Sequence, residues 1–185
     1  MRYLFLIFIP VIVFTGCNPP SEPSEGEQRK LDWCSTPGKT LQQLGWVWSQ
    51  NREIENYSSL LSDDYHFYFD DSSVGKHLDD GYVIPSSWDK NEDIQATHNM
   101  FNGNWDISLD ITNWEDYDYD PGGTEFTASM VNFRLYIWPE GPDWSELSLG
   151  SSVIAFRKID SNWLISGWHD DEEGALGMQR AQNHP

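Results

Sequence analysis

The stretch YSSLLSDDYHFYF, residues 57–69, indicates a change from helix to strand, because its hydrophobic period changes within a few residues. Up to Leu61, apolar side chains recur every three or four residues, as they do on one face of a helix. From Tyr65 onward the period changes to two. Tyr65, Phe67 and Phe69 fall on one side and His66 and Tyr68 on the other, as in a half-buried strand. We therefore expect a helix that ends at Asp63-Asp64, followed by a short aromatic strand over residues 65–69.

The segment before this stretch predicts a first helix. Thr36 offers a capping hydroxyl, and Pro37 suits the first helical position because its missing N–H has no partner there. Apolar positions then follow at helical spacing, at Leu41, Leu44, Gly45 and Trp48. We expect Leu41 and Leu44 to be buried.

The segment after the aromatic strand predicts one more helix and then only strands. Asp89 can cap this third helix, with Glu92 three residues further on, close to a capping box. The apolar line of the helix comprises Ile94, Thr97, His98 and Phe101, and Asn102-Gly103 ends it. Strand signals then cover residues 105–117, 125–138, 145–159 and 162–169. Short links rich in turn residues join them, so we expect an antiparallel meander.

The order of helix, helix, strand, helix and four strands indicates an α+β domain. In this order the chain resembles the nuclear transport factor two-like, or SnoaL-like, superfamily over residues 34–172. The residues that carry the resemblance are Thr36-Pro37 with Leu41 and Leu44, the stretch 57–67, Trp88-Asp89 with Glu92, and the closing NWLISGWHD of residues 162–170.

This resemblance implies a cone-shaped domain, in which three N-terminal helices pack on a strongly curved, mainly antiparallel sheet. Members of the superfamily often hold a small molecule in the cone, and many dimerise through the outer face of the sheet. Some members are isomerases, dehydratases or epoxide hydrolases, and many are not catalytic, so the fold alone does not determine the function.

The enzymes of the superfamily use carboxylates, histidines or tyrosines that point into the cone, and the resemblance therefore nominates His98, Asp93 and Tyr136 as weak catalytic candidates. His98 follows Ile94 by four residues, which predicts a position on the inner line of the third helix, where we expect it to be structural. We expect His66 to be exposed and Asp170 to begin a solvated acidic end. Sequence spacing pairs no acid with a base, so we favour a non-catalytic domain.

The predicted strand over residues 125–138 has two chemically different sides. One side is apolar and comprises Val131, Phe133, Leu135 and Ile137. The other mixes rings with hydrogen-bonding groups and comprises Asn132, Arg134, Tyr136 and Trp138. This second side is typical of a ligand pocket or of a dimer surface, and both interpretations stay open.

The sequence contains no motif that predicts a cofactor or a metal ion. The chain has no Gly-rich phosphate loop, zinc spacing or nucleophile elbow. The alternating aspartates of residues 116–120 resemble the start of a calcium loop, but Pro121 stands where glycine is required and Thr127 where glutamate is. Cys34 has no histidine near it in the sequence, so we expect an unreactive residue.

The first residues predict export and lipidation. Arg2 precedes an uncharged apolar run over residues 3–14, which is too short to span a bilayer and is typical of a signal peptide. Phe14-Thr-Gly-Cys17 resembles the bacterial lipobox, in which the cysteine is acylated and becomes the new N-terminus. Residues 18–28 are rich in proline, serine and glutamate, as in a disordered tether.

The chain therefore divides into a signal peptide over residues 1–16, a lipid-anchored tether over 17–33, the α+β domain over 34–172 and a polar tail over 173–185. Its net charge is −19, and cleavage before Cys17 removes one more positive charge. This charge opposes binding to nucleic acid. With Cys17 lipidated, Cys34 has no partner for a disulfide.

These features predict a lipoprotein of the bacterial cell envelope, held to either the inner or the outer membrane, whose cone binds a small apolar or aromatic-stacking ligand or a partner. A homodimer is one form that such a partner takes. The alternatives are a SnoaL-like enzyme and a structural envelope accessory. The 10 tryptophans exceed what a core of this size needs, so we expect some of them to line a pocket or an interface.

Overall fold

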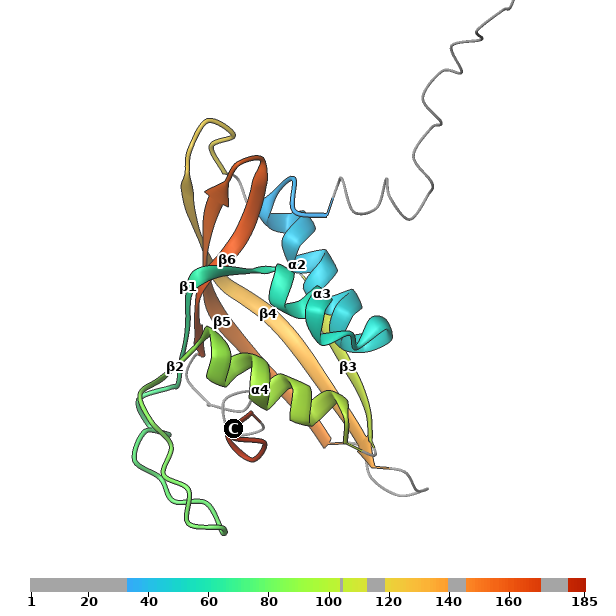
Figure 1. Cartoon of the computed structure of the whole chain (residues 1–185), viewed down its shortest axis with the longest axis vertical. Helices are drawn as coiled ribbons and strands as arrows, with labels where there is room; N and C mark the ends of the chain where they lie inside the picture. Colours follow the sequence, from blue (N-terminus) through green and yellow to red (C-terminus); the bar gives the residue numbers. More distant parts are fainter. Residues whose placement is uncertain (1–32, 104, 113–118, 140–145, 171–179) are drawn as a thin grey trace, which may run out of the picture.

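The computed structural model describes residues 33–103, 105–112, 119–139, 146–170 and 180–185 (Figure 1). Its helices are α2 (Pro37–Trp46), the π-helical turn η1 (Val47–Asn51), α3 (Ile54–Ser59) and α4 (Lys90–Phe101). Its strands are β1 (Leu61–Tyr68), β2 (Ser87–Asp89), β3 (Trp105–Ile111), β4 (Glu125–Pro139), β5 (Glu146–Ile159) and β6 (Asn162–Asp170).

The strands form one sheet with the order β2-β1-β6-β5-β4-β3, and the helices lie together on one side of its curve (Figure 1). Strands β3 to β6 pair antiparallel with their neighbours in chain order, which confirms the predicted meander. β1 pairs parallel with β6 and antiparallel with β2. The predicted α+β class, with helices on a curved and mainly antiparallel sheet, is confirmed.

Both predicted helix starts are present. The Thr36 hydroxyl accepts a hydrogen bond from the Lys39 N–H at 3.0 Å, and Pro37 opens α2. At α4, the Asp89 carboxylate accepts from the Glu92 N–H at 3.0 Å while the Glu92 carboxylate accepts from the Asp89 N–H at 2.9 Å. This reciprocal pair is a complete capping box, so the orientation of α4 is set by residues at its own first turn.

The predicted end of the second helix is wrong. α3 ends at Ser59, and Leu61 already opens β1, so Asp63 and Asp64 lie in a strand. Pairing with β6 explains the difference, because the Ile165 N–H donates to the Leu60 carbonyl at 2.8 Å. The helical spacing of apolar residues in the sequence therefore extends beyond the helix itself, because pairing with β6 holds the backbone there as a strand.

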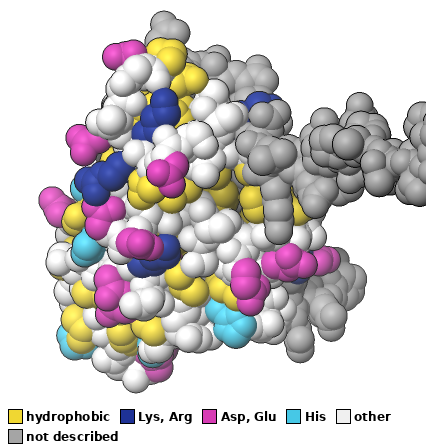
Figure 2. Space-filling model, turned by 45° about the horizontal axis from the view of Figure 1, so that its top comes forward, with side chains coloured by type: hydrophobic (Ala, Val, Ile, Leu, Met, Phe, Trp, Pro, Cys, Tyr) yellow, Lys and Arg dark blue, Asp and Glu magenta, His cyan; other side chains and the backbone are white. Residues whose placement is uncertain are grey.

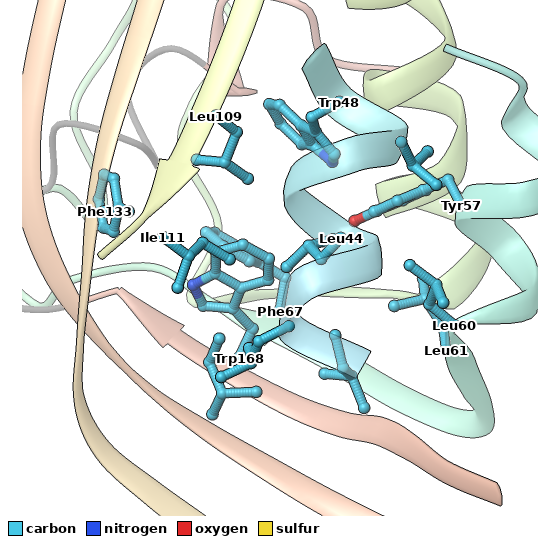
Figure 3. Packing of buried hydrophobic residues seen from close by; sticks show 14 of the residues in the cluster. Leu44, Trp48, Tyr57, Leu60, Leu61, Phe67, Leu109, Ile111, Phe133 and Trp168 are labelled. Carbon is cyan, nitrogen blue, oxygen red and sulfur yellow. The ribbon is translucent and has the colours of Figure 1, made fainter. Parts of the chain in front are cut away.

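The core fills the space between the helices and the sheet (Figure 3). Leu41 and Leu44 are fully buried, as predicted. The predicted sides of the aromatic strand are confirmed as well, with Tyr65, Phe67 and Phe69 buried and His66 and Tyr68 exposed. In Figure 3, Leu44 and Trp48 lie opposite Phe67, Trp168 and Leu109. Among the described residues, no helix combines the length and hydropathy needed to cross a membrane.

Candidate functional site

A group of polar side chains lies inside the cone, surrounded by the aromatic core. We call it the Asp93 cluster, and it comprises Tyr57 of α3, Tyr65 of β1, Asp93 and Thr97 of α4, and Arg180 of the C-terminal segment. Each of the five is at most 1% exposed. Buried charges are stable only when they are paired and hydrogen-bonded, so the contacts inside this cluster determine its chemistry.

The Asp93 carboxylate is the centre of the cluster. Its Oδ2 accepts a hydrogen bond from the Tyr57 hydroxyl at 2.6 Å, and its Oδ1 accepts from the Tyr65 hydroxyl at 3.3 Å. Arg180 Nη2 donates to Oδ1 and completes a buried ion pair. Because both oxygens accept from donors and one of the donors is a guanidinium, Asp93 is present as a carboxylate.

The sequence places Asp93 inward through the geometry of α4. Asp93 and Thr97 are four residues apart and so lie on the same face of the helix, together with Ala96. Thr97 Oγ1 accepts a hydrogen bond from Arg180 Nη2 at 2.9 Å, so this one face supplies two of the acceptors that hold the guanidinium. The capping box at Asp89 orients the same face toward the core.

Aromatic rings enclose the guanidinium. Arg180 Cζ lies 4.6 Å from the ring centroid of Phe67, 5.6 Å from that of Trp48 and 5.8 Å from that of Trp168. Rings at these distances stabilise a cation through their electron-rich faces. Trp48 and Trp168, two of the 10 tryptophans, are buried core residues that also surround a positive charge.

Burial shifts the acid–base properties of the cluster. Burial raises the pKa of Asp93, while Arg180 and the hydrogen bond from Tyr57 oppose that rise. Burial also raises the pKa of Tyr57 and of Tyr65. Burial is the largest single influence on Arg180 and acts to lower its pKa, but Asp93, Tyr57 and Tyr65 together outweigh it, so the net shift is upward. The guanidinium therefore stays charged at every pH at which the protein folds.

Of the catalytic candidates, Asp93 alone enters the cone. The predicted inward position of His98 is wrong, because its side chain is exposed and its Nε2 lies 2.8 Å from Nδ2 of Asn102. The buried positions of α4 are Asp93, Ala96, Thr97, Met100 and Phe101, so Thr97 and Phe101 of the predicted apolar line do face the core. Tyr136 is half-buried and belongs to the outer side of β4.

The polar side of β4 faces away from the core. Asn132 and Arg134 are exposed, whereas Phe133 and Leu135 between and beside them are buried. Of the set predicted as a ligand or dimer surface, Asn132, Arg134 and Tyr136 therefore lie outside the cone. The backbone of Trp138 pairs with Asp106, and its side chain lies outside the described part of the structure.

The remaining sequence candidates lie away from the cluster. Asp170 is only 7% exposed, so the prediction that it begins a solvated end is wrong. Cys34 is buried, and that burial raises the pKa of its thiol. The calcium-like aspartates fall mostly on residues 113–118, outside the described residues. Within the described ranges, no group of three or more His, Cys, Asp or Glu is arranged to hold a metal ion.

Arg180 is the member of the Asp93 cluster that the sequence did not predict. The domain was expected to end at residue 172, yet Arg180 and Ala181 are fully buried in it. Arg180 contacts Asp93 and Tyr57, which lie 87 and 123 positions away in the chain, so no local spacing could show the pairing. The segment after it is held on α4 through Asn99, whose Nδ2 donates to the carbonyls of Asn183 and His184 (Figure 1).

A groove lies on the surface between α3 and α4, apart from the Asp93 cluster. It has a volume of about 510 Å³ and is lined by Ile54, Glu55, Ser58, Ser59, Leu61, Lys90 and Ile94. Lys90 Nζ donates to the Leu61 carbonyl at 2.9 Å and so is already engaged at its edge. This groove is open and mostly apolar, and Glu55 and Lys90 are its charged lining residues.

Comparison with known proteins supports the fold. No family model matches the chain, and no curated protein matches it. Among solved structures, a conserved protein from Planctomyces limnophilus aligns over 71% of this chain and 88% of its own, with a TM-score of 0.50 and 14% identity. A protein of unknown function from Mycobacterium tuberculosis aligns over 83% and 77%, with a TM-score of 0.50 and 12% identity.

A nuclear transport factor two-like protein of unknown function from Prochlorococcus marinus is also similar, at 15% identity and a TM-score of 0.44, over 74% of this chain and 94% of its own. The chain shares its fold, helices on one side of a curved and mainly antiparallel sheet, with the two structures that align at a TM-score of 0.50. At these identities the likeness concerns the fold alone, so the function must be inferred from the residues of this chain.

Proposed function

We propose that this protein is an exported lipoprotein of the cell envelope, anchored through Cys17, whose cone domain is a non-catalytic binding module. One observation carries the non-catalytic part of this proposal. The polar centre of the cone is a buried carboxylate whose two oxygens are already held by Tyr57, Tyr65 and Arg180. General acid–base catalysis needs a group that exchanges a proton near working pH within reach of a substrate, and a carboxylate locked to a guanidinium does not meet that need.

The enzyme alternative predicts that a metabolite is converted to a product, and the binding proposal predicts that a metabolite is bound and left unchanged. The purified protein would be incubated with a mixture of small metabolites, and both bound and product species would be measured by mass spectrometry. A binding module retains at most one ligand per cone and forms no product. Product formation that the Asp93→Asn variant abolishes, at a normal fold, would establish the enzyme and refute the binding module.

The anchoring proposal rests on the apolar run over residues 3–14, on Cys17 and on the tether before α2. Labelled palmitate should enter the wild-type protein and the Cys34→Ala variant, and it should not enter Cys17→Ala. Cys34 is the matched control because it is buried in the folded domain. Label that persists in Cys17→Ala would refute lipidation at this position.

A homodimer through the outer face of β4 is the partner that we propose for the exposed side chains of Asn132 and Arg134. The protein should sediment as a dimer, and Tyr136→Glu should convert it to a monomer because a charge would enter the interface. Val83→Glu places the same charge at another exposed apolar residue, 45% exposed, and should leave the dimer intact. A wild-type monomer at high concentration would rule out this interface.

A further inference from the structure

We propose that the Asp93 cluster is a binding site for an alkylammonium group, and that Arg180 occupies this site as an internal competitor for such a ligand. This inference rests on the proposed binding role of the cone and specifies the chemical class of its ligand. It does not depend on the lipid anchor or on the dimer. The reasons lie in the number of acceptors, the number of donors and the walls of the site.

The acceptors of the site converge on a single nitrogen position. Arg180 Nη2 lies within hydrogen-bond distance of Asp93 Oδ1, of Thr97 Oγ1 at 2.9 Å and of Tyr57 Oη at 3.2 Å. Three side-chain oxygens thus surround one atom, but each terminal nitrogen of a guanidinium carries only two N–H groups. An ammonium carries three, and they point in three directions, so it satisfies all three oxygens at once.

The other donors of Arg180 are left without partners. Among the described residues, neither Nε nor Nη1 has a hydrogen-bond partner, although both atoms are buried. A buried donor that makes no hydrogen bond loses its solvation and gains nothing in return. The site therefore satisfies the hydrogen bonds of Nη2 and leaves those of Nε and Nη1 unmade. An ammonium on an apolar stem leaves no such donors.

The walls of the site suit the stem of that ligand. Phe67, Trp48 and Trp168 surround the Arg180 guanidinium carbon at 4.6–5.8 Å. Aromatic faces favour a cation and an apolar neighbour at the same time. A primary alkylamine is the class that combines these features.

The charge of the protein favours the same class. The net charge is −19, and acidic side chains are spread over the surface shown in Figure 2 with fewer lysines and arginines among them. A field of this sign raises the local concentration of small cations and speeds their encounter with the protein. It acts equally on all cations, so selectivity for an amine comes from the cluster itself.

The test uses the full-length protein in detergent and measures its melting temperature. Arg180→Ala empties the site, and n-propylammonium chloride is the probe. At about 100 times its Kd the probe should raise the melting temperature of this variant by about 5–10 °C. Tetramethylammonium has the same charge but no N–H donor, and it should have little effect. The double variant Asp93→Asn/Arg180→Ala should not respond to n-propylammonium.

A second pair of variants keeps the test decisive when Arg180→Ala fails to fold. Arg180→Lys presents an ammonium from the same position, one bond shorter, and should keep most of the melting temperature of the wild type. Arg180→Met has a similar stem without a charge and should lose much more. Equal melting temperatures for the Lys and Met variants would overturn the ammonium site, because its acceptors would then not distinguish a cation from an apolar chain.

The wild type tests the role of Arg180 as a competitor. n-Propylammonium should change the tryptophan fluorescence of the wild type at higher concentrations than in Arg180→Ala, because Trp48 and Trp168 line the site. A variant that responds while the wild type never does would overturn the competitor role. No response in either protein, or equal responses to propylammonium and tetramethylammonium, would overturn the site. Retention of a ligand of another class would leave the proposed binding function standing.

Discussion

Two aspartate–arginine pairs in this domain have the same chemistry and different surroundings. The side chains of Asp93 and Arg180 are both 0% exposed, inside the cone. Those of Asp64 in β1 and Arg157 in β5, the two strands that flank β6, are 51% and 43% exposed. Water solvates the outer charges whether or not they meet, whereas the inner charges have only each other and the cluster. The comparison teaches that burial, and not the pairing of charges, determines what such a contact contributes.

The pKa of the two aspartates follows the same division. Burial raises the pKa of Asp93 against the effect of its arginine. The pKa of Asp64 is lowered, first by the hydrogen bond from the Ser62 hydroxyl at 2.7 Å and then by the nearby Arg157. In water the partners of a carboxylate decide its pKa, and in the interior its desolvation is the larger influence.

The largest expected effect comes from breaking the inner pair. Arg180→Ala leaves the Asp93 carboxylate buried without its counter-charge, so the free energy of unfolding should fall by about 3–5 kcal/mol. Denaturant unfolding followed by tryptophan fluorescence measures the loss. Replacing both partners, as in Asp93→Leu/Arg180→Met, should recover most of it. A loss below about 1 kcal/mol in the single variant would show that the inner pair behaves like an exposed one.

An apolar truncation in the same interior separates charge from packing. Leu44 is fully buried in α2 and has no polar group, so Leu44→Ala should cost about 2–5 kcal/mol through lost contacts and a cavity. Chemical denaturation again gives the value. Unlike the loss in Arg180→Ala, this one should not be reversed by changing Asp93. A cost near zero would mean that α2 does not pack on the sheet.

The outer pair should matter much less. Arg157→Ala removes contacts with Asp64 and Glu125, but all three side chains are at least 43% exposed. The expected loss is about 0–1 kcal/mol, and added salt should reduce it further. Denaturation of the variant at low and high salt tests both statements. A loss equal to that of Arg180→Ala would contradict the role given to burial.

The smallest effect concerns the end of the segment that carries Arg180. His184 Nε2 lies 2.7 Å from Asp80 Oδ2, and the ring stacks on Tyr82 at 4.0 Å. The contact with Asp80 raises the pKa of His184 above its usual 6.5. The stabilisation is therefore complete below about pH 6.5 and disappears as the pH rises through the raised value.

The variant His184→Gln isolates this contribution. Its melting temperature should lie below that of the wild type under mildly acidic conditions, and the difference should vanish under alkaline ones. NMR titration of the His184 ring gives the pKa directly. A difference that grows with pH would reverse the assigned sign and remove the ion pair with Asp80 as its cause.

Much of the fold could be predicted because its signals are local. The Thr36 cap, the capping box of Asp89 and Glu92, and the alternation of the aromatic strand each depend on residues within a few positions. The end of α3 could not be predicted in this way, because the backbone of Leu60 accepts from Ile165 on β6. The inward position predicted for His98 is wrong although Thr97 and Phe101 of the same line are buried, because Asp93 and Ala96 rather than Ile94 and His98 complete the buried face of α4.

Neighbouring residues and composition suffice to predict the helix starts, the meander and the strongly acidic character of the protein, but not η1 or the short strand β2. Only the tertiary structure decided which of the 11 basic residues meets Asp93. A buried carboxylate needs a cation, but that need specifies no sequence position, and the partner comes from a polar segment 87 residues away. The tertiary structure also brings Phe67, Trp48 and Trp168 around the charge of Arg180. These rings come from β1, η1 and β6, which lie close together only in the folded domain.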